Sequence, residues 1–175
     1  MPKKIGNVRE RISENAREML LAGNLFSVRE LCDQCGIATG TLYNYFPNRE
    51  AVIAAVMSDS WKLTLQEMDE AAAASSDFRD GCGRIFNALL GYIRLFEPVF
   101  LSYGRTGRYE DARLNFHKRF RSSLTAKISL LSDRFSAGIS EDLLPVLGEV
   151  LITSAIGTDL SREDFEALVD LIASR

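Results

Sequence analysis

The chain has 175 residues, of which 46% are hydrophobic and 26% are charged, so it is long and apolar enough for one sizeable core, and disorder is excluded. Its net charge of −3 gives by itself no indication of a nucleic-acid partner, and its three cysteines in no framework spacing exclude a secreted disulfide scaffold. The charged N-terminal residues lead into an amphipathic segment, and no apolar run approaches the roughly 18 residues of a membrane span, so we expect a cytoplasmic protein.

Two helices are predicted near the N-terminus. Apolar residues recur at helical spacing over residues 8–20, and Gly23 ends this first helix. Ser27, followed three positions later by Glu30, forms a capping box, which satisfies two free amide donors at the start of a second helix. Gly36 ends the second helix, because glycine easily adopts a positive φ.

A third helix is expected from about Thr39 to Phe46, where Pro47 cannot continue it and disfavours helical geometry at the preceding residue. A much longer apolar stripe then runs from Asn48 to Ala74. A helix of this length would link two parts of the chain rigidly.

The remaining pattern is also helical, without strand-like alternation or an internal repeat. Further helices are expected over residues 77–96, 99–103 after Pro98, 109–135, 140–156 with Ser140 as the N-cap, and 161–173 with Ser161 as the N-cap. The predicted fold class is all-α, with about nine helices.

Residues 27–49 have the features of a helix-turn-helix, which needs a short positioning helix, a tight turn and a second helix that reaches the major groove. Hydroxyl groups are good phosphate donors, and threonine and asparagine can reach base edges. The inward faces are supplied by Leu31, Cys35, Ile37 and Leu42. The residues left to face outward are Thr39, Thr41, Tyr43, Asn44 and Tyr45.

Two more residues fit this interpretation. A glycine near a helix start weakens the helix by up to ~1 kcal/mol. Gly40 is therefore explained if the backbone at this point must approach a duplex closely. Arg49 stands at the start of the next helix, where its side chain and free backbone amides can meet a phosphate.

Residues 36–50, GIATGTLYNYFPNRE, resemble the signature of the TetR/AcrR family of bacterial transcription regulators, in which Gly-Thr-Leu-Tyr-x-Tyr/His-Phe ends the recognition helix. The resemblance covers about the first 55 residues, and the remainder agrees only in helix count and order. The sequence departs from the family in a short link at residues 23–26, in Ala38 where serine is frequent, and in Cys32 and Cys35 where alanine is usual.

The resemblance implies a homodimer. It implies a helix-turn-helix DNA-binding domain over residues 1–47, and a helical domain over residues 48–175 that holds a small ligand and the dimer interface. It also places threonine and asparagine side chains in the groove, and the tyrosines and the arginine on phosphates. The predicted DNA-binding residues are Ser27, Thr39, Gly40, Thr41, Tyr43, Asn44, Tyr45 and Arg49.

The predicted function is a sequence-specific DNA-binding transcription regulator, a repressor that a small-molecule ligand releases from a palindromic operator. Its expected partners are double-stranded operator DNA, a second copy of the chain and an unknown effector, with no membrane and no cofactor. The alternative is a helical ligand-binding or adaptor protein without DNA binding. Catalysis and a metal site are not expected, because no paired carboxylates or metal cluster occur and the single histidine, His117, has no nucleophile motif beside it.

Ligand and dimer surfaces are expected in the C-terminal helices. Ligand pockets are largely apolar, and the family places its pocket among helices that carry these aromatics: Phe86, Phe96, Phe100, Tyr103, Phe116 and Phe120. Apolar residues cover more than one face of the last two helices, which predicts a four-helix bundle across a two-fold axis. The predicted interface residues are Leu143, Leu147, Val150, Leu151, Phe165, Leu168, Val169 and Ile172.

Two patterns leave alternatives open. Cys32 and Cys35 form a C-x-x-C within one helix, which indicates either small core residues or a redox switch. A basic cluster indicates either a solvated helix face or the recognition of an anionic ligand. Its members are Arg105, Arg108, Arg113, Lys118, Arg119 and Arg121.

Overall fold

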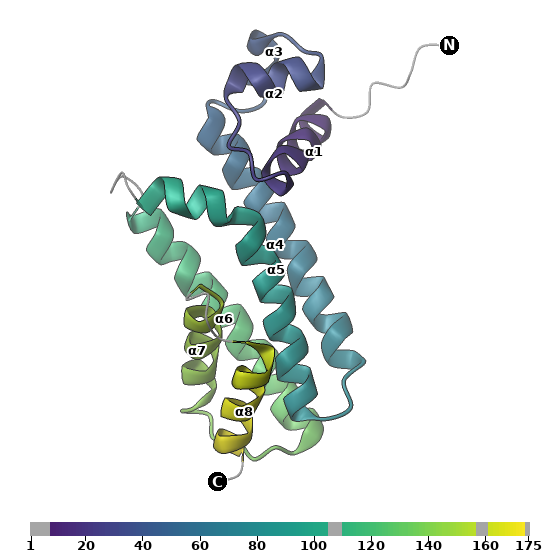
Figure 1. Ribbon diagram of the computed structural model, residues 1–175, viewed down its shortest axis with the longest axis vertical. Helices are drawn as coiled ribbons and strands as arrows, with labels where there is room; N and C mark the ends of the chain where they lie inside the picture. Colours follow the sequence, from purple (N-terminus) through teal and green to yellow (C-terminus); the bar gives the residue numbers. More distant parts are fainter. Residues whose placement is uncertain (1–7, 105–109, 157–160, 174–175) are drawn as a thin grey trace. The chain divides into compact units, whose positions relative to one another are not determined.

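The computed structural model describes residues 8–104, 110–156 and 161–173, and within them it contains α-helices and no strand (Figure 1). The predicted all-α class is confirmed, with eight helices in the described part where about nine were expected. The helices are α1 (Val8–Leu21), α2 (Val28–Cys35), α3 (Thr39–Tyr43), α4 (Arg49–Ala73), α5 (Phe78–Gly104), α6 (Glu110–Phe135), α7 (Leu144–Ile156) and α8 (Arg162–Ala173).

The signals predicted at the ends of α2 are present in the structure. The amide of Glu30 donates to Ser27 Oγ over 3.2 Å, and the amide of Ser27 donates to Glu30 Oε2 over 2.6 Å, which is the expected capping box. Gly36 follows the helix with φ of 62°, in the left-handed region where glycine carries no steric penalty. Helix α2 therefore begins and ends where local chemistry predicts.

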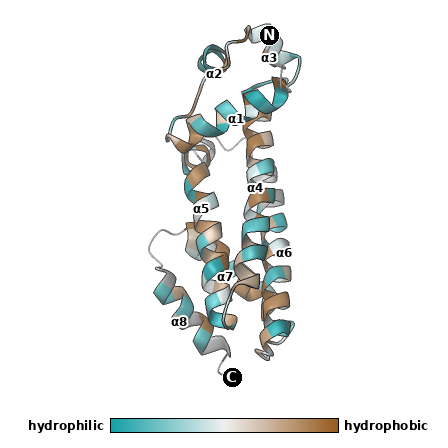
Figure 2. Cartoon of the chain, turned by 90° about the vertical axis from the view of Figure 1, so that its right-hand side faces the viewer, coloured by the Kyte–Doolittle hydropathy of each residue, from teal (hydrophilic) through white to brown (hydrophobic). Residues whose placement is uncertain are grey.

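Helix α3 is shorter than expected, since it ends at Tyr43 rather than Phe46. The amides of Tyr45 and Phe46 both donate to Leu42 O, so the chain leaves the helix in a turn before Pro47. The long helix α4 agrees with its prediction, and Asn48 Oδ1 caps it by accepting from the amide of Ala51 over 2.8 Å. Hydrophilic and hydrophobic residues alternate along α4 in Figure 2.

The predicted break at Pro98 is wrong, because α5 runs on through it to Gly104. Proline lacks an amide hydrogen, so the carbonyl four residues earlier, at Arg94, loses its helical donor. Arg94 is exposed, so water can satisfy that carbonyl. Phe96 and Val99, on either side of the proline, are fully buried and hold the helix in place.

Helix α5 is long and apolar enough, by length and composition, to cross a membrane. Its residues 78–102 include a window of mean hydropathy 1.3, of which 44% is buried inside the fold. Core side chains such as Ile85, Phe86 and Leu89, each 0% exposed, account for this hydropathy. Charged residues interrupt the segment, which is why the sequence shows no continuous apolar run.

The predicted start of α7 at Ser140 is also wrong. The amide of Leu143 donates to Ser140 O over 2.9 Å in a turn, and the helix begins only at Leu144. Pro145 explains the later start, because proline favours the first turn of a helix, where its missing amide hydrogen is not needed. The N-cap of α8 agrees with its prediction, since Ser161 Oγ accepts from the amide of Asp164 over 3.1 Å.

The chain forms two compact units, each with its own core. Unit 1 comprises residues 1–62 and 95–104, and unit 2 comprises residues 63–94 and 105–175, so α4 and α5 contribute to both. Large buried side chains of unit 1 include Ile12, Leu20, Phe26, Leu31, Leu42 and Ile53. Those of unit 2 include Met68, Ile85, Phe86, Leu89 and Phe165. The functional division at residue 47 stays a prediction.

Candidate nucleic-acid interface

The inner faces of α2 and α3 are packed as a helix-turn-helix requires. Leu31 and Leu42 are 0% exposed, and Cys32 and Cys35 are also buried, while Ile37 after the turn is half-buried. Leu42 is the only buried residue among the five of α3. This one side chain therefore fixes α3 to the rest of unit 1.

The outer face of α3 and the turn after it carry most of the residues predicted to contact DNA. Thr39 and Asn44 are exposed and Thr41 is half-buried. Tyr43 is 53% exposed and Tyr45 is 42% exposed, although a tyrosine ring is more commonly covered. The structure thus brings hydroxyl, amide and phenol groups together on a short exposed helix and the turn that follows it.

Gly40 has no role in the packing of this chain. A Cβ atom built on it would meet no other atom within 4 Å, and its φ lies outside the left-handed region. Neither space nor backbone geometry inside the protein therefore requires glycine at this position.

Ser27 lies exposed at the N-terminus of α2, where its hydroxyl has two functions open to it. Its Oγ accepts the capping bond from the amide of Glu30. Its hydrogen is engaged with the Glu30 carboxylate in this structure, so a phosphate oxygen would take the place of that carboxylate as acceptor. The bonds from the Ser27 amide and hydroxyl also hold the pKa of the Glu30 carboxyl below its ordinary value.

Arg49 makes contacts inside the protein that the sequence did not indicate. Its Nε donates to the backbone carbonyl of Phe26 over 2.6 Å, and its guanidinium carbon lies 5.8 Å from the centre of the Phe26 ring. Phe26 itself is 2% exposed. Arg49, which was predicted to contact a phosphate, therefore makes a structural contact within unit 1.

The two cysteines of the C-x-x-C are buried free thiols, as expected of small core residues. Cys35 Sγ lies 4.0 Å from the carbonyl oxygen of Arg11 in α1. Burial raises the pKa of both thiols above the ordinary cysteine value, which keeps them protonated and unreactive near neutral pH. No group of three or more potential metal ligands occurs among the described residues.

The described aromatics of the predicted ligand pocket are mainly core residues. In unit 2, Phe86 stacks on Phe165 with ring centres 4.8 Å apart, and Phe120 meets the ring of Tyr92 edge-on at 5.2 Å. In unit 1, Phe96 is 0% exposed and Phe100 is half-buried. The side chains of Tyr103 and Phe116 lie outside the described part of the chain.

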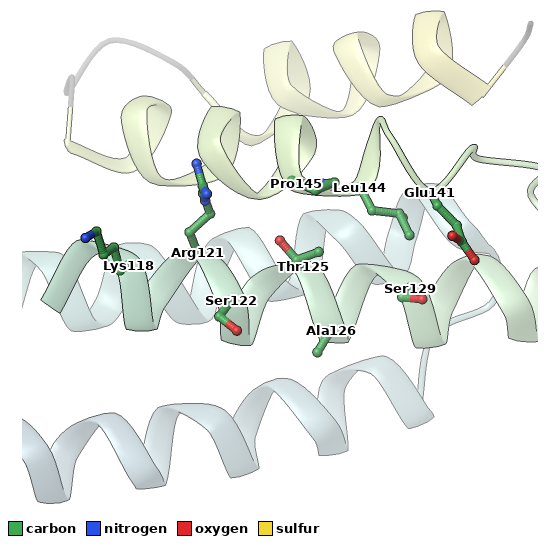
Figure 3. A pocket seen from close by; sticks show the side chains of 9 residues that line it. All are labelled: Lys118, Arg121, Ser122, Thr125, Ala126, Ser129, Glu141, Leu144 and Pro145. Carbon is green, nitrogen blue, oxygen red and sulfur yellow. The ribbon is translucent and has the colours of Figure 1, made fainter. Parts of the chain in front are cut away.

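An open groove of about 510 Å³ lies instead along α6 and the start of α7 (Figure 3). Lys118 and Arg121 of the predicted basic cluster line one end of it, and Glu141 lies at the other. Its remaining lining is Ser122, Thr125, Ala126, Ser129, Leu144 and Pro145. The sequence pattern indicated the two cations but not the hydroxyl groups of Ser122, Thr125 and Ser129, which line the same groove only in the folded protein.

Polar contacts to Glu149 of α7 occupy part of the same region. His117 Nε2 lies 3.2 Å from Glu149 Oε1, and Arg121 Nη1 lies 4.0 Å from Glu149 Oε2. These pairs join α6 to α7, whose backbones approach closely at Gly148. A Cβ on Gly148 would lie 3.0 Å from Thr125 Oγ1.

Half of the predicted dimer residues are covered by the chain itself. Leu147 and Leu151 of α7, and Phe165 and Val169 of α8, are at most 2% exposed. Leu143 remains exposed and Val150 half-buried, while the side chains of Leu168 and Ile172 lie outside the described part. The interface stays a prediction, and the exposed apolar side chains available for it are Val146 and Ile156 on α7 and Leu143 in the turn before it.

Known proteins resemble this chain in the sequence of its helix-turn-helix segment and in its fold. Residues 23–56 match the family model described as bacterial regulatory proteins of the tetR family. The chain is similar in structure to a candidate transcriptional regulator of Streptomyces coelicolor A3(2), with a TM-score of 0.70 and 14% identity over 97% of this chain and 100% of that chain.

Two further solved structures are similar. A transcriptional regulator of Cytophaga hutchinsonii ATCC 33406 has a TM-score of 0.66 and 16% identity, with 94% of each chain covered. A TetR-family transcriptional regulator of Streptomyces coelicolor has a TM-score of 0.63 and 14% identity over 95% of this chain and 92% of that chain. No curated protein matches the chain in sequence. Residues 23–56 thus match the tetR family in sequence, and the chain has the all-α fold of the transcriptional regulators in these solved structures.

Proposed function

We propose that this protein is a sequence-specific DNA-binding transcription regulator, which represses from a palindromic operator until a small molecule releases it. The observation that carries the proposal is the arrangement of α3. Leu42 is fully buried, whereas Tyr43 and Tyr45 are about half exposed beside it. One apolar anchor thus presents a row of polar and aromatic groups to the outside, as a recognition helix must.

Each group on this face has a role in the proposal. Thr39, Thr41 and Asn44 contact base edges, because hydroxyl and amide groups match the donor and acceptor pattern of the major groove. Tyr43 and Tyr45, with the Ser27 hydroxyl, donate to phosphates and hold the helix in register. The backbone at Gly40 lies against the duplex.

Asn44→Ala and Tyr43→Phe should separate base reading from phosphate binding. Asn44→Ala should relax preference at particular base pairs by about 1–3 kcal/mol, whereas Tyr43→Phe should weaken all duplexes about equally. Titration of a panel of singly substituted operator duplexes measures both effects. Asn44 and Tyr43 are exposed, so circular dichroism should show an unchanged fold in both variants. An unaltered base preference in Asn44→Ala would refute this division of roles.

A single helix-turn-helix makes too few contacts for tight binding at physiological salt, so the proposal includes a homodimer on two half-sites. The outer face of α7 offers the apolar surface for it. Val146 is 52% exposed and Ile156 is 55% exposed on α7, and Leu143, in the turn before it, is 41% exposed, so exposed aliphatic side chains gather here.

Val146→Asp should convert the dimer to a monomer at micromolar concentration, because the interface would bury an unpaired charge. Sedimentation equilibrium measures this directly. Leu130→Asp is the matched control, since Leu130 is 64% exposed on α6 and its replacement should leave the dimer intact. A wild-type protein that sediments as a monomer contradicts the dimer.

Release by an effector requires a ligand that prefers one spacing of the two recognition helices over another. Half-sites one turn apart demand a spacing of about 34 Å, and a coupling of ~1–3 kcal/mol changes occupancy several-fold. Helix α4 is the proposed lever, because its residues belong partly to the unit of the helix-turn-helix and partly to unit 2. Because such a regulator binds chromosomal DNA, the proposal includes a cytoplasmic location.

Selection of duplexes from a random DNA pool tests the proposal. Enrichment of a palindromic sequence, bound with a steep salt dependence, supports it. The second candidate is a helical ligand-binding or adaptor protein without DNA binding, favoured by the buried aromatics and the α6–α7 groove of unit 2. A pool that yields no enriched sequence and no salt-dependent affinity selects that candidate.

A further inference from the structure

One side chain joins the two ends of the helix-turn-helix. Phe26 comes directly before Ser27, the N-cap of α2, and Arg49 is the first residue of α4. The bond from Arg49 Nε to Phe26 O, 2.6 Å long, therefore links the residues that flank the segment 27–48. All of these residues belong to unit 1.

Arg49 is not placed for the stability of its own helix. A positive charge at a helix N-terminus opposes the helix dipole. The N-cap function of α4 is already met by Asn48. Its ion pair with the next residue, Arg49 Nη1 to Glu50 Oε1 at 4.0 Å, joins side chains that are 29% and 38% exposed, and such pairs contribute little. The long-range contact with Phe26 is the interaction that explains an arginine at this position.

That contact also constrains how Arg49 can meet DNA. A guanidinium binds phosphate best through two parallel N–H groups, and one such pair uses Nε. In this structure Nε is bonded to a carbonyl, and the group lies over the Phe26 ring. The orientation of Arg49 is thus set by the protein, with less than a third of its side chain exposed.

We propose that Arg49 is a positioning residue, which holds the start of α4 against the start of the helix-turn-helix so that α2 and α3 keep one orientation on α4. It is not a phosphate ligand. This inference rests on the proposed DNA-binding function and adds a route by which that function is regulated. A movement of the first part of α4 reaches α3 through the contact between Arg49 and Phe26.

The test compares Arg49→Gln and Arg49→Lys on two duplexes, the selected operator and a random sequence of equal length. Loss of a hydrogen bond from a charged donor should lower operator affinity by about tenfold, with random-duplex affinity within about twofold and an unchanged salt slope. Lysine should not rescue, because an ammonium group cannot lie flat on Phe26 while it donates to the carbonyl. Arg29→Gln removes the same charge from an exposed position of α2 and gives the effect of charge alone.

A phosphate ligand would behave differently. Both affinities would then fall together, the salt slope would become shallower by about 0.9, and Arg49→Lys would retain most of the binding. That result overturns the proposal. A loss of global stability would lower the active fraction equally for both duplexes, so the ratio of operator to random affinity separates positioning from simple destabilisation.

Hydrogen exchange on the free protein gives a readout that needs no DNA. Arg49→Gln should speed amide exchange over residues 24–30 and at the start of α4, while Arg29→Gln should not affect the start of α4. Unchanged exchange in Arg49→Gln overturns the proposal even if the protein proves not to bind DNA. Wild-type protein without specific binding, in contrast, contradicts the proposed function and leaves the exchange result to decide on the contact.

Discussion

Replacing Gly40 by leucine should abolish operator binding and leave the fold unchanged. Nothing lies within 4 Å of a Cβ at this position, so the protein itself has room for a side chain. Leucine is also the better helix former, by ~0.5–1 kcal/mol, so α3 should become more stable. A folded Gly40→Leu variant that loses operator binding would therefore indicate a partner that approaches the backbone of α3.

The expected loss of affinity is large because a clash at the start of α3 displaces the whole recognition helix. Each lost base contact costs about 1–3 kcal/mol, so the operator affinity of Gly40→Leu should fall about 100-fold or more. Gly40→Ala should lie between wild type and leucine. The measurement is operator binding by fluorescence anisotropy, together with thermal unfolding.

Gly91→Leu provides a matched control for this experiment. Gly91 lies exposed in α5, and a Cβ built on it also meets nothing within 4 Å. The same chemical change, made outside the proposed interface, should leave operator affinity at the wild-type value. If Gly40→Leu binds the operator as wild type does, the backbone at Gly40 is not at the duplex.

The elements that could be predicted from the sequence are those with local signals. Ser27 with Glu30 and Gly36 define α2 through bonds between neighbours in the chain, so residue identity alone suffices. The serine before α8 behaves in the same way. The exposed face of α3 could also be predicted, because Leu42 is its one apolar anchor and helical geometry then places the other side chains.

Predictions were wrong where a local rule competed with packing or with a second local rule. Pro98 does not end α5, because its buried neighbours Phe96 and Val99 keep the helix in the core. Ser140 does not cap α7, because Pro145 moves the helix start to Leu144. In each of these cases, the competing residue is visible in the sequence, but the sequence does not show which of the two effects is stronger.

The sequence also did not show which residues contact one another across the fold. Periodicity shows that α7 and α8 have apolar faces, but not which surface covers them. Leu151 and Phe165 turn out to be covered within the chain. The contact between Arg49 and Phe26 joins residues that are 23 positions apart, and no spacing rule connects them. Contacts of this kind decide whether a residue serves the fold, the dimer or the DNA.

Leu42→Ala should remove DNA binding by the opposite route, through the stability of α3. Leu42 is 0% exposed and is the single buried residue of that helix. Truncation of a buried leucine costs about 2–5 kcal/mol, and a domain has only about 5–15 kcal/mol in total. A five-residue helix has little stability of its own, so α3 should lose its ordered position on unit 1.

The expected result is loss of operator binding, with faster amide exchange over residues 38–46 and retention of the dimer by sedimentation. Leu42→Met keeps the volume and should cost less than about 1.5 kcal/mol, so it should still bind. Leu130→Ala, at a residue 64% exposed on α6, controls for truncation of a leucine as such. Full operator affinity in Leu42→Ala would show that α3 is held by other contacts. Gly40→Leu with a stable fold and Leu42→Ala with a loosened one should then lose the same activity, which only a DNA-facing α3 anchored by Leu42 explains.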